Sequence, residues 1–263
     1  MSISKLSQID PNAHIGKNVT IEAFCVVDGD VEIGENCWIG PHVTIMNGTK
    51  IGNNCKVFPG TVLGSIPQDL KFDGEESLLE IGNNVVIREY CTVNRGTKAN
   101  FKTHIKDNTM LMAYVHVAHD CIIGEHSVLV NNVNLAGHIE IGKYVIMGGM
   151  SAVHQFVKIG DFCMIGGGSL VRKDVPPYVK AAREPLSYAG VNSIGLRRRG
   201  FSNKQINHIQ DIYRVLFVKG YNTRQAMRII ETTINATAER ETILAFMSQT
   251  DRGIMKGFRQ TGS

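Results

Sequence analysis

The chain has 263 residues, of which 43% are hydrophobic and 20% are charged, so it can form a folded core and is not a disordered charged tail. Its net charge of +4 is too small to indicate a nucleic-acid-binding protein, although it suits an acidic partner. No apolar run reaches the ~20 residues of a membrane-spanning helix, and the polar start from Met1 to Lys5 does not resemble a signal peptide. We therefore expect a cytoplasmic protein without a transmembrane segment.

An aliphatic residue recurs every six positions between Ile9 and Val171, at 25 of the 28 places in that phase. A period of six fits neither the 3.6-residue turn of an α-helix nor a long alternating strand. Short strands joined by corners do fit it, and hexapeptide repeats are typical of a parallel β-helix with three hexads in each coil. The repeat therefore predicts an all-β solenoid, with glycine, asparagine or aspartate at the corners, because these residues tolerate unusual backbone angles.

All six cysteines fall at one position of this repeat, where other hexads carry valine or threonine. That position points inward, so we expect buried thiols that act as small hydrophobic side chains. The pattern therefore predicts neither a metal cluster nor a nucleophile at Cys25, Cys37, Cys55, Cys91, Cys121 and Cys163.

Two segments interrupt the repeat, one between Leu63 and Ile81 and the other from Lys98 to His104. Insertions in a solenoid commonly protrude from one face and line a binding surface. We therefore expect protruding loops near residues 65–80 and 98–104.

The repeat ends after Val175, and helical patterns follow it. Ser202 and Gln205 have the spacing of a capping box, and Gly220 is a suitable stop for the helix that they begin. The apolar stripe of this helix consists of Ile206, Ile209, Tyr213, Leu216 and Phe217.

Two more helical patterns cover Thr223–Ile234 and Thr237–Ser248. We therefore divide the chain into a β-helix over residues 1–190 and a C-terminal helical domain over residues 191–263. The helices are expected to cover the end of the solenoid, because an open end would expose its core.

Histidines gather at one corner of the predicted solenoid, because residues 18 apart stack on neighbouring coils. His119 stacks on Gly137, and Gly137 stacks on Gln155. Asp120 stacks on His138 in the same way. The histidines of this corner are His116, His119, His138 and His154.

A histidine beside a carboxylate is suited to general-base catalysis, because the ordinary pKa of imidazole, ~6.5, lies near working pH. Asp120 would set the tautomer of His119, and the backbone N–H of Gly137 would be open to a developing oxyanion. This arrangement predicts acyl transfer without a cofactor or a metal. Zinc chemistry is the alternative, because three imidazoles can bind zinc and activate a water molecule.

Seven motifs together make the chain resemble the UDP-N-acetylglucosamine O-acyltransferase family, whose members begin lipid A synthesis. The likeness extends over essentially the whole chain, whereas other hexapeptide acyltransferases share the repeat but not this set. The motifs are Gln68–Lys71, His116–Cys121, Leu135–His138, Ala152–Phe156, Asp174–Tyr178, Gly190–Asn192 and Arg198–Phe201.

The resemblance implies a left-handed β-helix, a homotrimer with sites between subunits, and transfer of an (R)-3-hydroxyacyl group from acyl carrier protein to the sugar 3-hydroxyl. It implies that His119 is the general base, Asp120 its orienting carboxylate and Gly137 the oxyanion donor. Residues matching substrate contacts are Asp69, Lys71, His116, His138, His154, Gln155, Asn192, Arg198 and Arg199.

Three positions bear on specificity. Asn94 and Ile194 depart from the family pattern, which commonly has histidine at the first and an acidic residue at the second. Gly167 falls where the family measures acyl length, and glycine there implies a longer chain. Two other activities remain open: N-acyl transfer to an acylated UDP-glucosamine, and zinc-dependent hydration of the γ-carbonic-anhydrase type.

Overall fold

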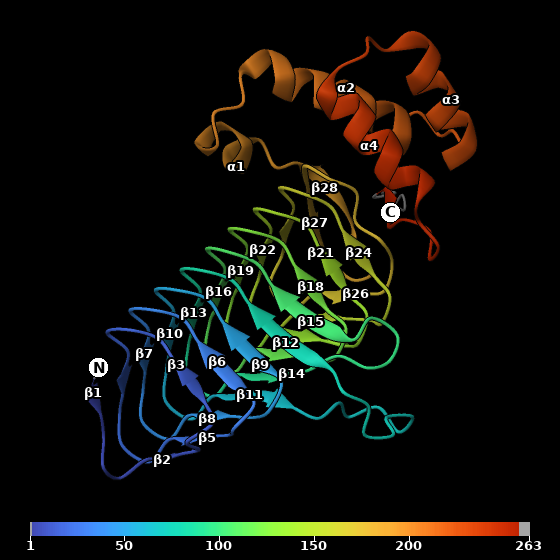
Figure 1. Ribbon diagram of the computed structural model, residues 1–263. Coiled ribbons are helices and arrows are strands. Elements are labelled where there is room, and N and C mark those ends of the chain that lie inside the picture. Colours follow the sequence, from blue (N-terminus) through green and yellow to red (C-terminus); the bar gives the residue numbers. More distant parts are fainter. Residues whose placement is uncertain (1, 258–263) are drawn as a thin grey trace.

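Short parallel strands wind into a left-handed β-helix with three faces in the computed structural model, which describes residues 2–257 (Figure 1). Strands one coil apart pair in register, as Ser2 pairs with Thr20 and Gln8 with Val26. The predicted parallel β-helix and its implied left hand are both confirmed. The helices follow at its C-terminal end.

Each face of the solenoid is one sheet. Sheet A consists of β1 (Ser2–Ile3), β4 (Thr20–Ile21), β7 (Trp38–Ile39), β10 (Lys56–Val57), β13 (Val86–Ile87), β16 (Met110–Leu111), β19 (Val128–Leu129), β22 (Ile146–Met147), β25 (Met164–Ile165), β27 (Val179–Ala182), β28 (Ser187–Val191) and β29 (Lys256–Gly257). Sheet B consists of β2 (Gln8–Ile9), β5 (Val26–Val27), β8 (Thr44–Ile45), β11 (Val62–Ser65), β14 (Thr92–Asn94), β17 (His116–Val117), β20 (Asn134–Leu135), β23 (Ala152–Val153) and β26 (Leu170–Val171). Sheet C consists of β3 (His14–Ile15), β6 (Val31–Ile33), β9 (Thr49–Ile51), β12 (Leu78–Ile81), β15 (Lys102–Ile105), β18 (Ile122–Ile123), β21 (Glu140–Ile141) and β24 (Lys158–Ile159).

The core of the solenoid is filled by the aliphatic residue of each hexad and by the small residue before the next strand. Ile39 and Ile45 are fully buried, as the six-residue period requires. All six cysteines are buried free thiols, so their predicted role as small hydrophobic side chains is confirmed. Burial raises the pKa of the Cys121 and Cys163 thiols to about 12, which keeps them protonated and unreactive.

The corners of the solenoid match the expected backbone angles at their asparagines, but not at the glycines that follow the aliphatic residue. The left-handed residue of a corner is commonly asparagine or an aromatic, such as Asn36 (φ 58°) and Tyr144 (φ 57°). Glycines that follow the aliphatic residue, such as Gly124, serve another purpose. A Cβ on Gly124 would lie 2.4 Å from the carbonyl carbon of Gly142 on the next coil. These glycines allow coils to approach closely and do not provide the unusual backbone angles. The prediction is therefore wrong for them, but it is confirmed for asparagine and for corner glycines such as Gly60 (φ 72°) and Gly168 (φ 70°).

Two insertions leave the solenoid at the corner between sheets B and C. They occupy residues 66–77, between β11 and β12, and residues 95–101, between β14 and β15. Figure 1 shows both on the same side of the molecule. The Glu75 Oε1 atom accepts a hydrogen bond from the Lys98 N–H at 2.9 Å, so the two insertions support each other.

The C-terminal segment contains four helices within residues 2–257: α1 (Ser193–Arg198), α2 (Asn203–Phe217), α3 (Thr223–Thr233) and α4 (Ala238–Ser248). The predicted capping box of Ser202 and Gln205 is confirmed, as are the two later helices to within a residue.

The sequence patterns did not predict α1 or β29. Strand β29 pairs with β28 and returns the chain to sheet A; residues 258–263 of the predicted helical domain lie outside the described residues. None of the described helices combines the length and apolar character that a membrane crossing requires.

Tyr213 of α2 joins the helices to the solenoid. Its side chain is fully buried, and its hydroxyl donates a hydrogen bond to the Pro177 carbonyl at 2.5 Å. Tyr213→Phe is expected to lower the free energy of unfolding by about 1–3 kcal/mol, because a buried carbonyl loses its donor. Urea unfolding measures the loss. Tyr221→Phe is the control, since Tyr221 is 42% exposed, and an equal loss in both variants would contradict the prediction.

Candidate active site

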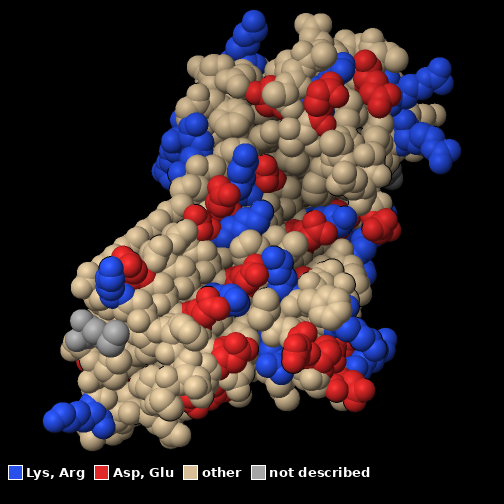
Figure 2. Space-filling view, in the orientation of Figure 1, with Lys and Arg blue, Asp and Glu red and all other residues tan. Residues whose placement is uncertain are grey.

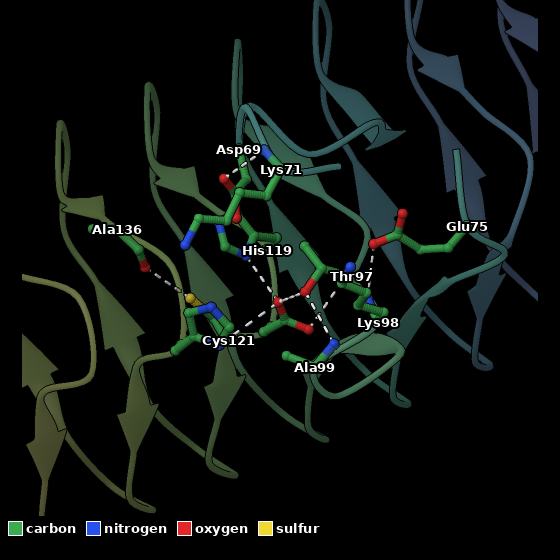
Figure 3. Close-up of polar contacts among 11 residues, drawn as sticks. Asp69, Lys71, Glu75, Thr97, Lys98, Ala99, His119, Cys121 and Ala136 are labelled. Carbon is green, nitrogen blue, oxygen red and sulfur yellow. Dashed lines mark hydrogen bonds and ion pairs between the residues drawn. The ribbon is translucent and has the colours of Figure 1, made fainter. Parts of the chain in front are cut away.

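A histidine–aspartate pair lies at the corner between β17 and β18. The Nδ1 atom of His119 is 2.8 Å from Oδ2 of Asp120. Figure 3 labels His119, and Asp120 is drawn there without a label. The Asp120 side chain is fully buried. Asp120 occupies the left-handed corner position (φ 60°), which turns its carboxylate back toward the preceding histidine. Because a carboxylate only accepts hydrogen bonds, Nδ1 carries the proton in neutral His119, and Nε2 is left as an acceptor.

A second donor to this carboxylate comes from outside the repeat. Thr97, in the insertion of residues 95–101, donates its backbone N–H to Asp120 Oδ1 at 3.0 Å. Its hydroxyl donates to Asp120 Oδ2 at 2.6 Å (Figure 3). The sequence patterns missed Thr97, because the predicted interruption began only at Lys98, whereas the insertion in the structure occupies residues 95–101.

His138 completes the cluster one coil further along. Its Nδ1 atom lies 3.7 Å from Asp120 Oδ2, and its ring meets the His119 ring edge-on with centroids 4.9 Å apart. Phe156 stacks on the other side of His138 at 4.5 Å. The predicted stacking of Asp120 on His138 is therefore confirmed.

Burial and hydrogen bonding act on this cluster in opposite directions. Burial raises the pKa of Asp120, but hydrogen bonds from His119 and Thr97 outweigh it and bring that pKa below its ordinary value. Burial lowers the pKa of His138, and the nearby carboxylate of Asp120 opposes this only in part. At neutral pH the site therefore holds an ionised Asp120 beside a neutral His138.

Gly137 lies directly against the ring of His119, as the stacking of coils predicts. A Cβ at Gly137 would be 2.5 Å from Cε1 and 2.7 Å from Nε2 of His119, so no larger residue fits with the ring in place. The neighbouring N–H groups of Ala136 and His138 bond to the coils on either side, at Val153 and His119. In the described chain the Gly137 N–H makes none of these coil-to-coil bonds, so it is available to another acceptor.

A cleft of about 690 Å³ opens beside the cluster. Asp69 and Lys71 reach it from the insertion of residues 66–77, and Asp251 reaches it from the C-terminal segment. The Asp69 carboxylate accepts a hydrogen bond from the Lys71 N–H at 3.0 Å (Figure 3). Lys158 and Glu140 also line the cleft and form an ion pair at 3.6 Å. Figure 2 shows acidic and basic side chains mixed over the face of the molecule that it draws. The cleft therefore presents both signs of charge to a ligand.

Three other predicted residues lie on or beside sheet B. His116 is on β17, where its Nδ1 atom is 2.7 Å from the Thr92 hydroxyl, and burial lowers its pKa. His154 and Gln155 follow β23 and are exposed, with His154 Nδ1 3.2 Å from the Gln155 carbonyl oxygen. The close ring contact in the predicted four-histidine corner is thus between His119 and His138.

The remaining predicted residues lie at the other two corners. Asn192 caps α1 and donates to the Phe162 carbonyl at 2.9 Å. Arg199 lies over the Tyr144 ring, 4.4 Å from its centroid, at the corner between sheets C and A, and Arg198 is exposed nearby. Gly167 lies between β25 and β26, where a Cβ would meet the Gly149 carbonyl oxygen at 3.2 Å.

Asn94 and Ile194, the two departures from the family pattern, lie in different environments. Asn94 is buried and donates from its side chain to the Ile66 carbonyl at 2.6 Å, so it holds the start of the first insertion. Ile194 is 64% exposed on α1. Asn94 thus has a structural role here, whereas Ile194 leaves an apolar side chain where the family pattern has a charge.

Three side chains could hold a metal ion within residues 2–257. The ligand atoms of His119, Asp120 and His138 lie within 4.8 Å of one another. This set has two imidazoles and a carboxylate, whereas a zinc hydratase of the γ-carbonic-anhydrase type needs three imidazoles. His116, the nearest further histidine in the sequence, is engaged with Thr92.

Sequence and structural comparisons agree with this geometry. A family model described as UDP N-acetylglucosamine O-acyltransferase, domain 2, matches residues 174–255, and a bacterial transferase hexapeptide model matches residues 30–65 and 102–137. The chain is 54% identical over 247 residues, 94% of its length and 91% of the relative's, to an acyl-(acyl-carrier-protein)–UDP-N-acetylglucosamine O-acyltransferase of Sulfurihydrogenibium. It is 49% identical to one from Trichlorobacter lovleyi, over 98% of this chain and all of the relative. The UDP-N-acetylglucosamine acyltransferase structure from Bacteroides fragilis superimposes with a TM-score of 0.95 at 46% identity, covering 96% of this chain and 99% of that one. The predicted resemblance is confirmed, and the chain belongs to the UDP-N-acetylglucosamine O-acyltransferase family.

Proposed function

We propose that this protein transfers an (R)-3-hydroxyacyl group from acyl carrier protein to the 3-hydroxyl of UDP-N-acetylglucosamine, the first step of lipid A biosynthesis. The observation that carries this proposal is the His119–Asp120 pair at 2.8 Å, with the Gly137 backbone directly against the histidine ring. The family membership supports the substrates, because the curated relatives are named for the same donor and acceptor.

The reaction begins when Nε2 of His119 takes the proton of the sugar 3-hydroxyl. The hydroxyl oxygen attacks the carbonyl carbon of the carrier thioester, and the resulting oxyanion accepts a hydrogen bond from the Gly137 N–H. The C–S bond then breaks, and the protonated His119 returns its proton to the leaving thiolate of the carrier. Asp120 holds the ring and stabilises its charged form throughout. The products are an acylated sugar nucleotide and the free carrier thiol.

The substrate contacts follow from the charges around the cleft. Lys71 offers a cation and Asp69 an acceptor to the sugar nucleotide, beside His138 in the same cleft. We assign His116, His154 and Gln155 to acyl and sugar contacts on the adjoining coils. Arg198 and Arg199 suit the phosphates of the nucleotide and of the carrier's prosthetic group, with Asn192 beside them.

The placement of these residues supports a homotrimer. Arg199 lies at the corner between sheets C and A, whereas His119 lies at the corner between sheets B and C. One chain therefore cannot present both to a single ligand at the same corner. In a three-fold assembly, the arginine corner of one copy would face the histidine corner of the next.

Gly167 sets acyl length in this proposal, because it adds no side chain to the corner between β25 and β26, where even a Cβ would meet the Gly149 carbonyl oxygen at 3.2 Å. We infer a longer acyl chain than a bulkier residue would allow.

We place the protein in the cytoplasm, since six buried free thiols suit a reducing compartment. The N-acyltransferase and zinc-hydratase alternatives are not favoured, because the relatives are O-acyltransferases and the metal-type cluster lacks a third imidazole.

A product assay tests the function directly. The purified protein is incubated with UDP-N-acetylglucosamine and (R)-3-hydroxyacyl carriers of several chain lengths, and the products are weighed by mass spectrometry. We expect an acylated sugar nucleotide whose acyl group is removed by mild base, as an ester is. A base-stable amide product would instead indicate the N-acyltransferase, and no gain of acyl mass with any donor would contradict the proposal.

A further inference from the structure

Thr97 is the residue outside the repeat that contacts the buried carboxylate of the active site. We propose that Thr97 is a positioning residue for the reaction: it fixes the rotation of the Asp120 carboxylate and, through it, the ring of His119. This inference rests on the proposed function, in which His119 is the general base. It adds a third member to the His119–Asp120 pair.

The two oxygens of the Asp120 carboxylate accept hydrogen bonds from different donors. Oδ1 of Asp120 accepts the Thr97 N–H at 3.0 Å, and Oδ2 accepts the Thr97 hydroxyl at 2.6 Å. Oδ2 also accepts from Nδ1 of His119 at 2.8 Å. Thr97 places one donor on each oxygen and so fixes the carboxylate plane, whereas the histidine alone would leave the carboxylate free to turn about its Cβ–Cγ bond.

The direction of the Thr97 hydroxyl hydrogen is itself set by the loop. Its oxygen accepts the Ala99 N–H at 3.2 Å, so its own hydrogen is directed at Asp120. A continuous path of hydrogen bonds therefore runs from Ala99 through Thr97 and Asp120 to His119. Each donor in this path favours the ionised form of Asp120, which in turn favours the tautomer of His119 that leaves Nε2 unprotonated.

The loop that carries Thr97 is held by hydrogen bonds on both sides of this residue. Thr97 is only 6% exposed, and the next residue, Lys98, donates its N–H to Glu75 of the other insertion at 2.9 Å. On the other side, Gly96 donates its N–H to the Leu78 carbonyl at 3.1 Å. The insertion that carries Thr97 is therefore tied to the insertion that carries Asp69 and Lys71.

Valine and serine variants of Thr97 separate positioning from packing. Thr97→Val keeps the shape and the backbone donor but removes the hydroxyl, and it is expected to lower kcat about 10- to 100-fold with little change in KM. Thr97→Ser restores the hydroxyl and should keep kcat within about threefold of the original. Thr103→Val is the matched control, because Thr103 is buried on β15 and its hydroxyl has no hydrogen-bond partner in the described part of the chain.

A double-mutant cycle with Asp120→Asn tests whether Thr97 acts through Asp120. If it does, adding Thr97→Val to Asp120→Asn should lower kcat no further, since the carboxylate that Thr97 positions is already gone. Heteronuclear NMR of the histidine rings gives a readout that does not depend on turnover. The Nδ1–H signal of His119 should be present in the unmodified protein and in Thr97→Ser, and lost or mixed with the other tautomer in Thr97→Val.

The outcomes separate this inference from the proposed function. Thr97→Val with kcat unchanged, or losses that multiply in the double variant, would overturn the role of Thr97. An unmodified protein that forms no acylated sugar nucleotide would overturn the proposed function instead. In that case the NMR comparison still decides whether Thr97 orients His119.

Discussion

Replacing His119 with alanine is expected to lower kcat by about 10²- to 10⁴-fold, because the sugar hydroxyl loses the base that takes its proton. The effect should lie mainly in kcat, since proton transfer develops in the transition state rather than on binding. The Nε2 atom is available for this step because Nδ1 is engaged with Asp120 at 2.8 Å. Steady-state kinetics with a hydroxyacyl carrier and UDP-N-acetylglucosamine measure the loss.

Two further variants make this prediction specific. His119→Gln keeps most of the volume of the ring and should be equally impaired if the base is what matters. His14→Ala removes an exposed histidine on β3 and should leave kcat unchanged. Circular dichroism and gel filtration should show the same fold and assembly in all three variants. Full activity in His119→Ala would contradict the assignment of the base.

Gly137→Ala is expected to cost about 10²-fold or more in kcat, although it adds only one methyl group. The new Cβ would lie 2.5 Å from Cε1 of His119, far inside van der Waals contact. The ring cannot move away without lengthening its bond to Asp120, and a displacement of ~1 Å in a catalytic group is enough for such a loss. The Gly137 N–H would move as well, so both the base and the oxyanion donor are affected.

A second glycine provides the control for this substitution. A Cβ at Gly29 would meet the Asp10 carboxylate at 3.0 Å, and that side chain can move aside. Gly29→Ala should therefore keep its activity, and the same kinetic assay compares the two variants. If Gly137→Ala retained full kcat, the reaction would not take place against this face of His119.

Much of this molecule could be predicted from the six-residue period. A strict repeat places Ile39 and Cys121 in the core without any knowledge of the structure. It also places His119 on Gly137 and Asp120 on His138, because residues one coil apart are 18 apart in the unbroken stretch. The buried core and the contacts of His119 and Asp120 could therefore be predicted from the sequence. In a regular stack of coils, the number of residues between two positions determines how far apart they lie.

The rest depends on features that have no period. Thr97 reaches Asp120 from an insertion, where the spacing of residues no longer reports which coil they meet. Helix α1 is too short to give a recognisable apolar stripe in the sequence. Strand β29 pairs with sheet A only after four helices have turned the chain back. The role of the glycines that follow the aliphatic residue was misjudged, because close approach between coils and a left-handed backbone both favour glycine.

Strand β29 has a consequence for how long the solenoid can grow. A parallel β-helix ends in unpaired strand edges, which can recruit another molecule and propagate into a fibre. In sheet A, the last full coil is followed by the antiparallel strand β28 and then by β29, only two residues long. Asp174 anchors this return through the Thr250 hydroxyl and the Met255 N–H. At this end, sheet A therefore stops at an edge strand of only two residues, and so short an edge offers little for another molecule to pair with.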